Sequence, residues 1–210
     1  MKKLALLLIS ALLLSGCNRL DNHQPLSSHP LSFAKVNVIK QTFVAHRNDL
    51  NMVYICLKNP ARTLVPLRFT LTDDLGLVIR QLDFTGGNID NFDCTRFQFD
   101  PIKDSVLRTY SAAVSVVLDP TLTSKEQESL RSGLYAEAHG GGDYLGGTAY
   151  LDGLEVPYDL HFKTLYYQPL KEVFAESAWQ FLYRLTQDPL FFLVFLTFIG
   201  GVIYQLTKAK

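Results

Sequence analysis

Few side chains in this sequence stand in a pattern that could perform covalent chemistry. The run His139-Gly140-Gly141-Gly142 could present backbone N–H groups to an oxyanion, but acyl transfer also needs a Gly-x-Ser-x-Gly nucleophile elbow, which the sequence lacks. The glycines are not followed by Lys and Ser or Thr, so they do not form a phosphate loop. We interpret them as a flexible turn between strands. The alternative is a ligand-binding edge formed by His139, Asp143 and Tyr144.

Metal and acid–base sites are equally hard to find. The five histidines are His23, His29, His46, His139 and His161, and no two of them have the two- or four-residue spacing typical of zinc ligands. Asp73 and Asp74 fit an ordinary turn, with calcium binding as the alternative. No pair of acidic residues is singled out for hydrolysis. We therefore expect no metal, no cofactor and no enzymatic activity.

Cys56 and Cys94 could form a disulfide bond. The bridge would close a loop of about 39 residues and stabilise the fold by about 4 kcal/mol in the chain-entropy model. Two buried free thiols are the alternative, because the sequence does not fix which strands are neighbours. An oxidising compartment would favour the bridge, so the targeting signals matter.

The N-terminus has the pattern of a signal peptide. Met1-Lys2-Lys3 is followed by the apolar stretch Leu4–Leu14, which is too short to span a bilayer as a helix. The next residues, Leu14-Ser15-Gly16-Cys17, resemble the lipobox of bacterial lipoproteins. This resemblance implies cleavage after residue 16, a lipid on Cys17 and a place in the cell envelope. Asn18 stands where Asp would signal inner-membrane retention, which favours the outer membrane.

The C-terminus carries a second candidate anchor. Leu190–Leu206 contains no charged residue and would be about 26 Å long as a helix, so we predict a transmembrane helix over 189–207. Lys208 and Lys210 place the tail, 208–210, in the cytoplasm. A buried core helix is the alternative. Thr197 and Gly201 form a small-xxx-small pair that could support a homodimer.

An amphipathic helix is expected at 168–188, just before this span. Apolar residues recur there at three- and four-residue steps, and Asp188-Pro189 should end the helix. Its apolar stripe could pack on the preceding domain or lie along the membrane surface. The sequence leaves both open.

The middle of the chain has the pattern of an all-β domain. Residues 17–33 are polar and turn-rich, so we predict a lipidated tether there. From residue 34 to 167, short runs of β-branched and aromatic residues alternate with turns, which predicts an antiparallel β-sandwich in the periplasm. A single internal helix is expected at Ser124–Ser132, closed by Gly133.

Several segments of this domain carry a further resemblance. Among others, Gln41–Ala45, Phe97–Ser105 and Asp159–Phe162 are similar to a jelly-roll-like β-sandwich module in extracytoplasmic parts of bacterial membrane glycosyltransferases and related envelope proteins, and the similarity spans most of residues 41–167. The similarity lies in turns and core aromatics, and it implies contact with a glycan or an envelope protein. The chain lacks the multi-spanning transferase part.

Two functions follow as hypotheses. Lys and Arg balance Asp and Glu at 20 each, which gives no electrostatic basis for binding nucleic acid. The favoured function is a non-catalytic, envelope-anchored binding or accessory module. The alternative is a membrane-bridging protein resembling a phage single-chain spanin. The predicted parts would reach about 115 Å if all stood end to end, which is short for an ordinary periplasm.

Overall fold

The structure, a computed structural model, describes residues 16–141 and 144–208. Residues 18–167 form one compact unit that holds the sheets, and the C-terminal helices belong to a second unit. The elements are β1 (Gly16–Gln24), β2 (His29–Ser32), β3 (Val38–Val44), β4 (Leu50–Ile55), β5 (Leu57–Lys58), β6 (Pro66–Asp73), β7 (Val78–Thr85), η1 (Gly86–Asn88), β8 (Thr95–Ile102), β9 (Thr109–Val116), α2 (Ser124–Arg131), β10 (Tyr135–Gly140), β11 (Ala149–Leu151), β12 (Leu154–Val156), β13 (Tyr158–Leu160), β14 (Phe162–Pro169), α3 (Leu170–Gln187) and α4 (Pro189–Lys208).

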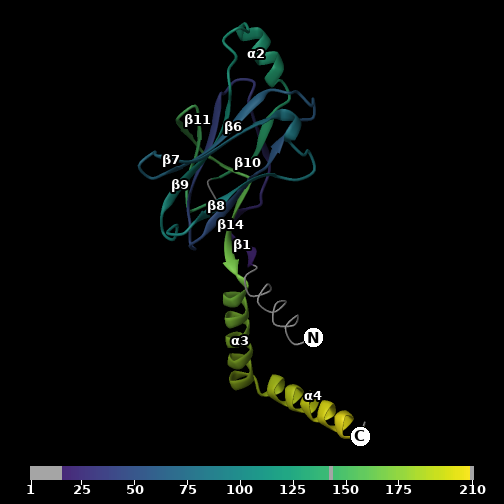
Figure 1. Cartoon of the computed structure of the whole chain (residues 1–210). Coiled ribbons are helices and arrows are strands. Elements are labelled where there is room, and N and C mark those ends of the chain that lie inside the picture. Colours follow the sequence, from purple (N-terminus) through teal and green to yellow (C-terminus); the bar gives the residue numbers. More distant parts are fainter. Residues whose placement is uncertain (1–15, 142–143, 209–210) are drawn as a thin grey trace, which may run out of the picture. The chain divides into compact units, whose positions relative to one another are not determined.

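Three sheets make up the first unit (Figure 1). Their strand orders are β1-β14-β4-β8, β13-β10-β2 with β5 also on β10, and β12-β11-β3-β9-β6-β7. Every strand pair with a defined register in the described residues is antiparallel. The expected antiparallel, sandwich-like β architecture is therefore confirmed.

Aromatic side chains connect the six-stranded sheet with the sheet β1-β14-β4-β8. Phe69 of β6 stacks on Phe97 of β8 at 4.1 Å between ring centroids, and Phe43 of β3 meets Phe162 of β14 at 6.0 Å. Strict alternation in β3 and β9 turns one face of each strand inward, and that face is apolar except at Gln41 of β3. Because the contacts cross from one sheet to the other, they form the core between two layers.

The prediction of a tether over 17–33 is wrong for most of its length. β1 and β2 occupy that range and pair with β14 and β10. The inward residues of β1 are polar, yet Asn22 and Gln24 are buried. The backbone N–H of Asn22 donates to Thr164 Oγ1 at 3.1 Å, and its side-chain amide donates to the Val44 carbonyl at 2.8 Å. A strand whose inner face is satisfied by hydrogen bonds shows no apolar alternation.

The internal helix and the β6–β7 hairpin lie where the sequence predicts them. Thr123 caps α2 in a capping box with Glu126, and Gly133 follows the helix with φ +82°. At the β6–β7 hairpin Asp73 Oδ1 accepts the N–H groups of Leu75 and Leu77, which is the chemistry of an ordinary turn.

The disulfide between Cys56 and Cys94 is confirmed. Cys56 is fully buried in the gap between β4 and β5, and Cys94 directly precedes β8. The backbone of Cys56 donates to the His161 carbonyl and accepts from the Glu137 N–H at 2.8 Å. The bridge thus lies where the strands of two sheets meet.

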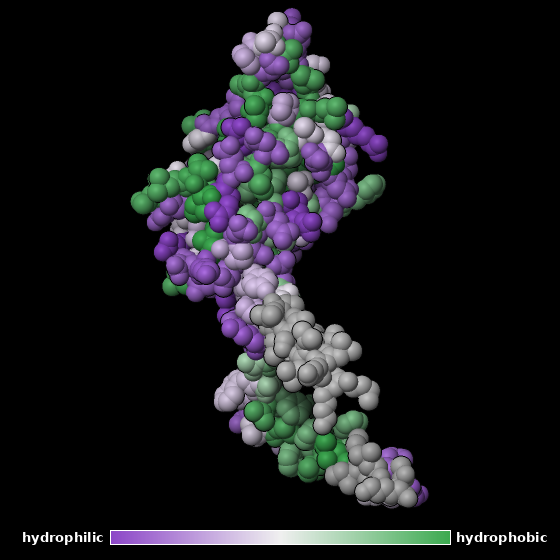
Figure 2. Space-filling view, in the orientation of Figure 1, coloured by the Kyte–Doolittle hydropathy of each residue, from purple (hydrophilic) through white to green (hydrophobic). Residues whose placement is uncertain are grey.

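The C-terminal unit contains α3 and α4, which meet at Asp188 as the sequence predicts. Asp188 accepts the N–H groups of Leu190 and Phe191, and Phe181 of α3 contacts Phe191 and Phe195 of α4. Hydrophobic side chains cover much of the visible face of these helices (Figure 2). Among the described residues no single helix meets the length and hydropathy expected of a membrane span. The pair Leu170–Gln187 and Pro189–Gly201, bent by 107°, meets them jointly.

Candidate ligand site on the outer face of β10

The outer face of β10 carries three polar side chains in a row. Ala136 and Ala138 are fully buried, so the alternation of the strand turns Tyr135, Glu137 and His139 to the opposite face. This face is extended by β2 on one edge of the strand and by β5 and β13, one after the other, on the opposite edge. Three neighbouring strands therefore frame one polar and aromatic surface.

An open hollow lies on this surface. Its volume is about 520 Å³, within the range of small-ligand sites. Hydroxyl groups, an imidazole, a phenol and a carboxylate line it, from Ser27, Ser28, His29, Pro30, Ser32, Gly133, Tyr135 and Glu137. The His29 ring also packs on Tyr158 at 5.4 Å between centroids. The hollow therefore offers aromatic rings and hydrogen-bonding groups side by side.

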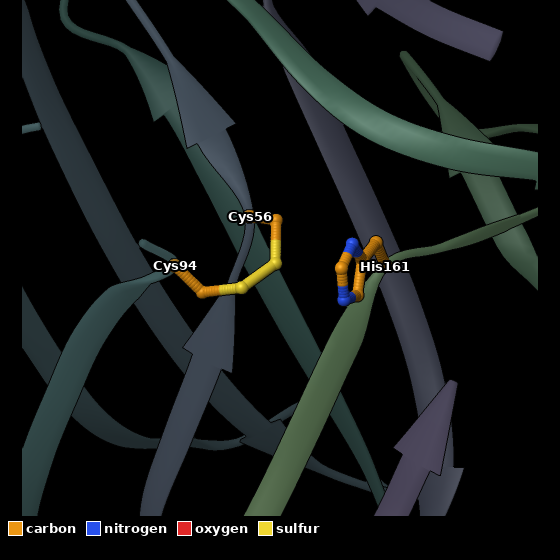
Figure 3. A group of neighbouring side chains, drawn as sticks. All are labelled: Cys56, Cys94 and His161. Carbon is orange, nitrogen blue, oxygen red and sulfur yellow. A yellow bond between two sulfur atoms is a disulfide. The ribbon is translucent and has the colours of Figure 1, made fainter. Parts of the chain in front are cut away.

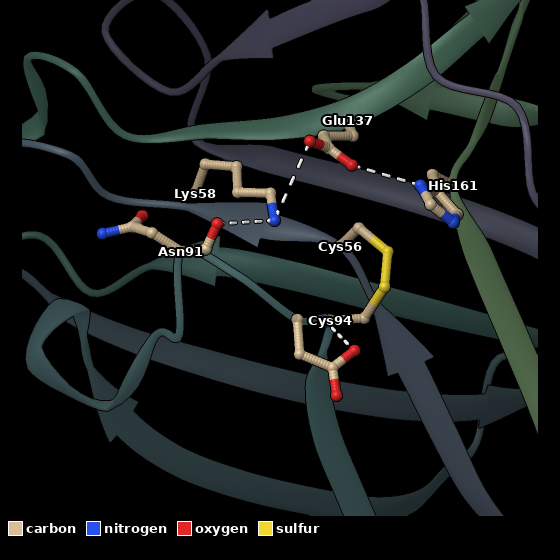
Figure 4. The surroundings of a disulfide bond; sticks show 7 residues. Cys56, Lys58, Asn91, Cys94, Glu137 and His161 are labelled. Atoms are coloured by element: carbon tan, nitrogen blue, oxygen red, sulfur yellow. Dashed lines mark hydrogen bonds and ion pairs between the residues drawn. A yellow bond between two sulfur atoms is a disulfide. The ribbon is translucent and has the colours of Figure 1, made fainter.

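Glu137 is the centre of a charged network at the edge of the hollow. Its carboxylate lies 3.1 Å from His161 Nδ1 and 3.9 Å from Lys58 Nζ (Figure 4). Lys58 Nζ also donates to the Asn91 carbonyl at 3.0 Å. The side chains of Lys58, Glu137 and His161 are all less than a quarter exposed, so solvent screens their contacts only partly. The network fixes the orientation of the Glu137 carboxylate.

Cys56, Cys94 and His161 form a neighbouring group with potential metal ligands. One ligand atom from each residue lies within 4.8 Å of the others (Figure 3). Two thiolates and one imidazole are a donor set that Zn²⁺ prefers. In the disulfide form the two sulfurs are bonded to each other, so no thiolate is available to bind a metal. The disulfide then serves as a covalent cross-link.

The structure shows a serine–histidine contact that the sequence did not reveal. Ser28 Oγ lies 2.9 Å from Nδ1 of both His139 and His29. Because 111 residues separate Ser28 from His139, no local motif could have identified the pair. A histidine beside a serine hydroxyl is the start of a nucleophilic site. This contact is exposed, however, whereas activated nucleophiles depend on a water-excluded surrounding.

Tyr144 lies among buried side chains of the domain, whereas His139 lies on the outer face of β10. The Tyr144 hydroxyl donates to Asn22 Oδ1 at 2.9 Å and its backbone N–H donates to Asp159 Oδ2 at 2.9 Å. Its ring packs edge-on against Phe162, and burial raises the pKa of Tyr144 to about 12. These contacts join Tyr144 to a polar cluster inside the domain. Asp143 lies outside the described residues, so the three-residue ligand edge stays a prediction.

Glu137 and Lys58 are two further residues of this site that sequence reasoning missed. Glu137 carries a usable signal, because it alternates with two alanines in a predicted strand. Lys58 carries none, since it joins the site only through the register of β5 on β10. Comparison with known proteins gives no match to the chain, either to a family model or to an individual curated sequence.

Proposed function

We propose that the chain is a lipoprotein of the bacterial envelope whose periplasmic sheet domain acts as a non-catalytic binding or accessory module. Cys17 carries the lipid, α4 provides a membrane helix, and both anchors enter one membrane. The outer face of β10 contacts a glycan or the exposed part of an envelope protein.

The observation that carries the single-membrane arrangement is where the chain enters and leaves the sheet domain. Asn18 Oδ1 accepts a hydrogen bond from Asn51 Nδ2 at 2.7 Å, and the N–H of Tyr167 donates to the Asp49 carbonyl at 2.9 Å. Both ends of the domain are thus held beside the first residues of β4. Cys17 is the residue before Asn18, so its lipid would leave from the same end as α3.

This arrangement weakens the bridging hypothesis. The reach expected from the sequence adds a tether, the full domain and an upright helix in series. Because β1 starts at Gly16 and both ends of the domain lie side by side, the tether and the domain add nothing to the distance between the lipid and the membrane helix. Only α3 adds to that distance, and its 18 residues extend about 27 Å. A spanin-like protein must cross the whole periplasm, and this distance is too short.

The composition of the outer face of β10 supports a binding role. Tyr135 and His29 supply ring faces, and Ser28, Ser32 and Glu137 supply hydrogen-bonding groups around one hollow. Sugar ligands use this combination of stacking and hydrogen bonds. The jelly-roll resemblance of the sequence points to the same ligand class.

The anchoring is tested by fatty-acid labelling and membrane fractionation of the wild type and of Cys17→Ser. We expect labelled fatty acid to enter the wild type only. Both forms should sediment with the inner membrane, since α4 would hold the unlipidated variant there. This expected inner-membrane location follows from the position of the two chain ends. It differs from the outer-membrane location that Asn18 favours.

A matched deletion of residues 190–210 completes this experiment. It should stay membrane-associated through the lipid, because two or three acyl chains bind firmly. Equal labelling of the wild type and Cys17→Ser would contradict the lipid anchor. Wild type in the outer membrane, with Cys17→Ser in the inner membrane, would favour bridging instead.

The non-catalytic role predicts modest effects from side-chain removal. Ser28→Ala and His139→Ala each delete one hydrogen-bonding group, so ligand affinity should fall by about tenfold or less. Loss of a catalytic serine or histidine would cost about a thousandfold or more. Complementation of a gene deletion measures the difference, with Ser32→Ala as the control on the same face. A complete loss of function in a folded, correctly localised Ser28→Ala variant would identify an enzyme.

A further inference from the structure

The β8–β9 loop, residues 103–108, presents an apolar tip at the end of the domain where the chain enters and leaves. Leu107 is 78% exposed and Val106 is 40% exposed. Leu107 also has φ +60°, a left-handed conformation that is unfavourable for a bulky L-residue. A strained backbone that holds a leucine out into solvent is typical of a functional contact.

The loop is ordered by bonds to residues 45–50, the segment before β4. Ser105 is fully buried, and its hydroxyl donates to the Arg47 carbonyl at 2.8 Å and accepts the Leu50 N–H at 3.1 Å. The Leu107 N–H donates to the Ala45 carbonyl, and the Val106 N–H donates to Asn48 Oδ1 at 3.1 Å. The exposure of Leu107 is therefore a fixed feature of the loop.

The same segment holds both ends of the domain. Asn48, which binds Val106, is next to Asp49, whose carbonyl accepts the Tyr167 N–H. Asn51, two residues further, binds Asn18. Figure 1 shows β1 and β14 together at one end of the domain. The apolar tip thus lies within a few residues of the two points from which the proposed anchors continue.

Basic side chains stand beside the apolar tip. Arg47, Lys103 and Arg108 are exposed beside Leu107, and the acidic residues at this end of the domain include Asp49, Asp73, Asp74 and Asp104. The exposed basic side chains can pair with phospholipid headgroups, while Val106 and Leu107 supply the apolar wedge. Long basic side chains can reach headgroups while an apolar neighbour enters the acyl boundary.

We propose that the β8–β9 loop docks on the lipid bilayer, with Leu107 inserted at the interface. The inference rests on the proposed function, because the lipid on Cys17, the residue before Asn18, would bring the bilayer to this end of the domain. One leucine binds a membrane only weakly by itself. Attachment in the same molecule makes the contact intramolecular, so a small apolar wedge suffices to fix the orientation of the domain.

The test places a tryptophan at the tip of the full-length, lipidated protein reconstituted in phosphatidylethanolamine–phosphatidylglycerol vesicles. The only natural tryptophan is removed by Trp179→Phe, and Leu107→Trp supplies the reporter. Brominated acyl chains should quench this tryptophan and its emission should shift to the blue, since interfacial insertion reaches about 5–10 Å into the headgroup and acyl boundary.

The matched control is Leu154→Trp in the same Trp179→Phe background. Leu154 is 74% exposed and begins β12. Its partner Leu151 pairs with Ile39 at the start of β3, whereas Thr109, after the β8–β9 loop, pairs with Val44 at the end of β3. The control therefore lies at the opposite end of the six-stranded sheet. Its emission should stay unquenched and water-like.

Vesicle flotation separates the two proposals. If both variants float and the Leu107→Trp reporter is quenched while the Leu154→Trp control is not, the docking is supported. If both variants float and neither tryptophan is quenched or blue-shifted, the anchoring stands and the docking is wrong. A blue-shifted but unquenched reporter in the loop would mean that the tip is buried against the protein itself or a second copy of it, and would overturn docking on the bilayer. Failure to float would overturn both proposals.

Discussion

Replacing Cys56 and Cys94 together by Ala is expected to lower the free energy of unfolding by about 4 kcal/mol. The bridge spans 38 residues of sequence, and releasing it restores the conformational entropy of that loop in the unfolded chain. For a domain of this size the midpoint of thermal unfolding should fall by about 10 °C. Denaturation of the purified protein under non-reducing conditions measures both quantities, in a Cys17→Ser background that removes the third cysteine.

The reduced wild type provides the control for this experiment. It should unfold at nearly the same midpoint as the double variant, because both lack the bridge but share all other contacts. Thiol-blocking mass measurement on the unfolded, unreduced protein should find both cysteines protected. Free reaction of both thiols, or equal stability with and without reductant, would show that the bridge does not form in the cell.

The bridge also matters for the candidate site. The Cys56 carbonyl accepts the Glu137 N–H at 2.8 Å, so the stapled segment is bonded to the strand that carries the outer face. Lys58, two residues further, reaches Glu137 and the Asn91 carbonyl. We therefore expect loss of the bridge to weaken ligand binding as well as stability, since Glu137 would lose its fixed surroundings.

Gly147→Ala is expected to destabilise the fold by about 3 kcal/mol, as is typical of overpacking. A Cβ on Gly147 would lie 1.9 Å from the Thr42 carbonyl oxygen, which is backbone and cannot rotate away. The two segments are also tied together, because Thr148 N–H donates to Thr42 Oγ1 at 2.7 Å. Urea denaturation, read as a change of midpoint at constant slope, measures the loss.

Gly140→Ala is the matched control for that substitution. The nearest atoms to its added Cβ are side-chain carbons of His29 and Tyr158 at 3.5 Å, which is ordinary contact. Its stability should change by about 0.5 kcal/mol or less. Equal midpoints for the two variants would mean that β3 and the segment before β11 are not packed as closely as described.

The local elements of this protein could be predicted from short stretches of its sequence. Strict alternation identified strands such as β6, Gly133 marked the end of α2, and Asp188-Pro189 marked the break between α3 and α4. These features depend on residues within a few positions of each other, so a short window contains all the information. The even number of cysteines left after Cys17 pointed to the bridge, although the sequence left open whether it forms.

Contacts between distant residues, in contrast, became visible only in the folded chain. β1 was missed because its buried amide Asn22 finds its partners at Thr164 and Val44, 142 and 22 residues away. The same applies to Ser28 with His139, and to the two ends of the domain that meet beside Asp49. A polar side chain satisfied by a remote partner leaves no periodic trace in its own segment, because the free energy of its burial is set by that partner.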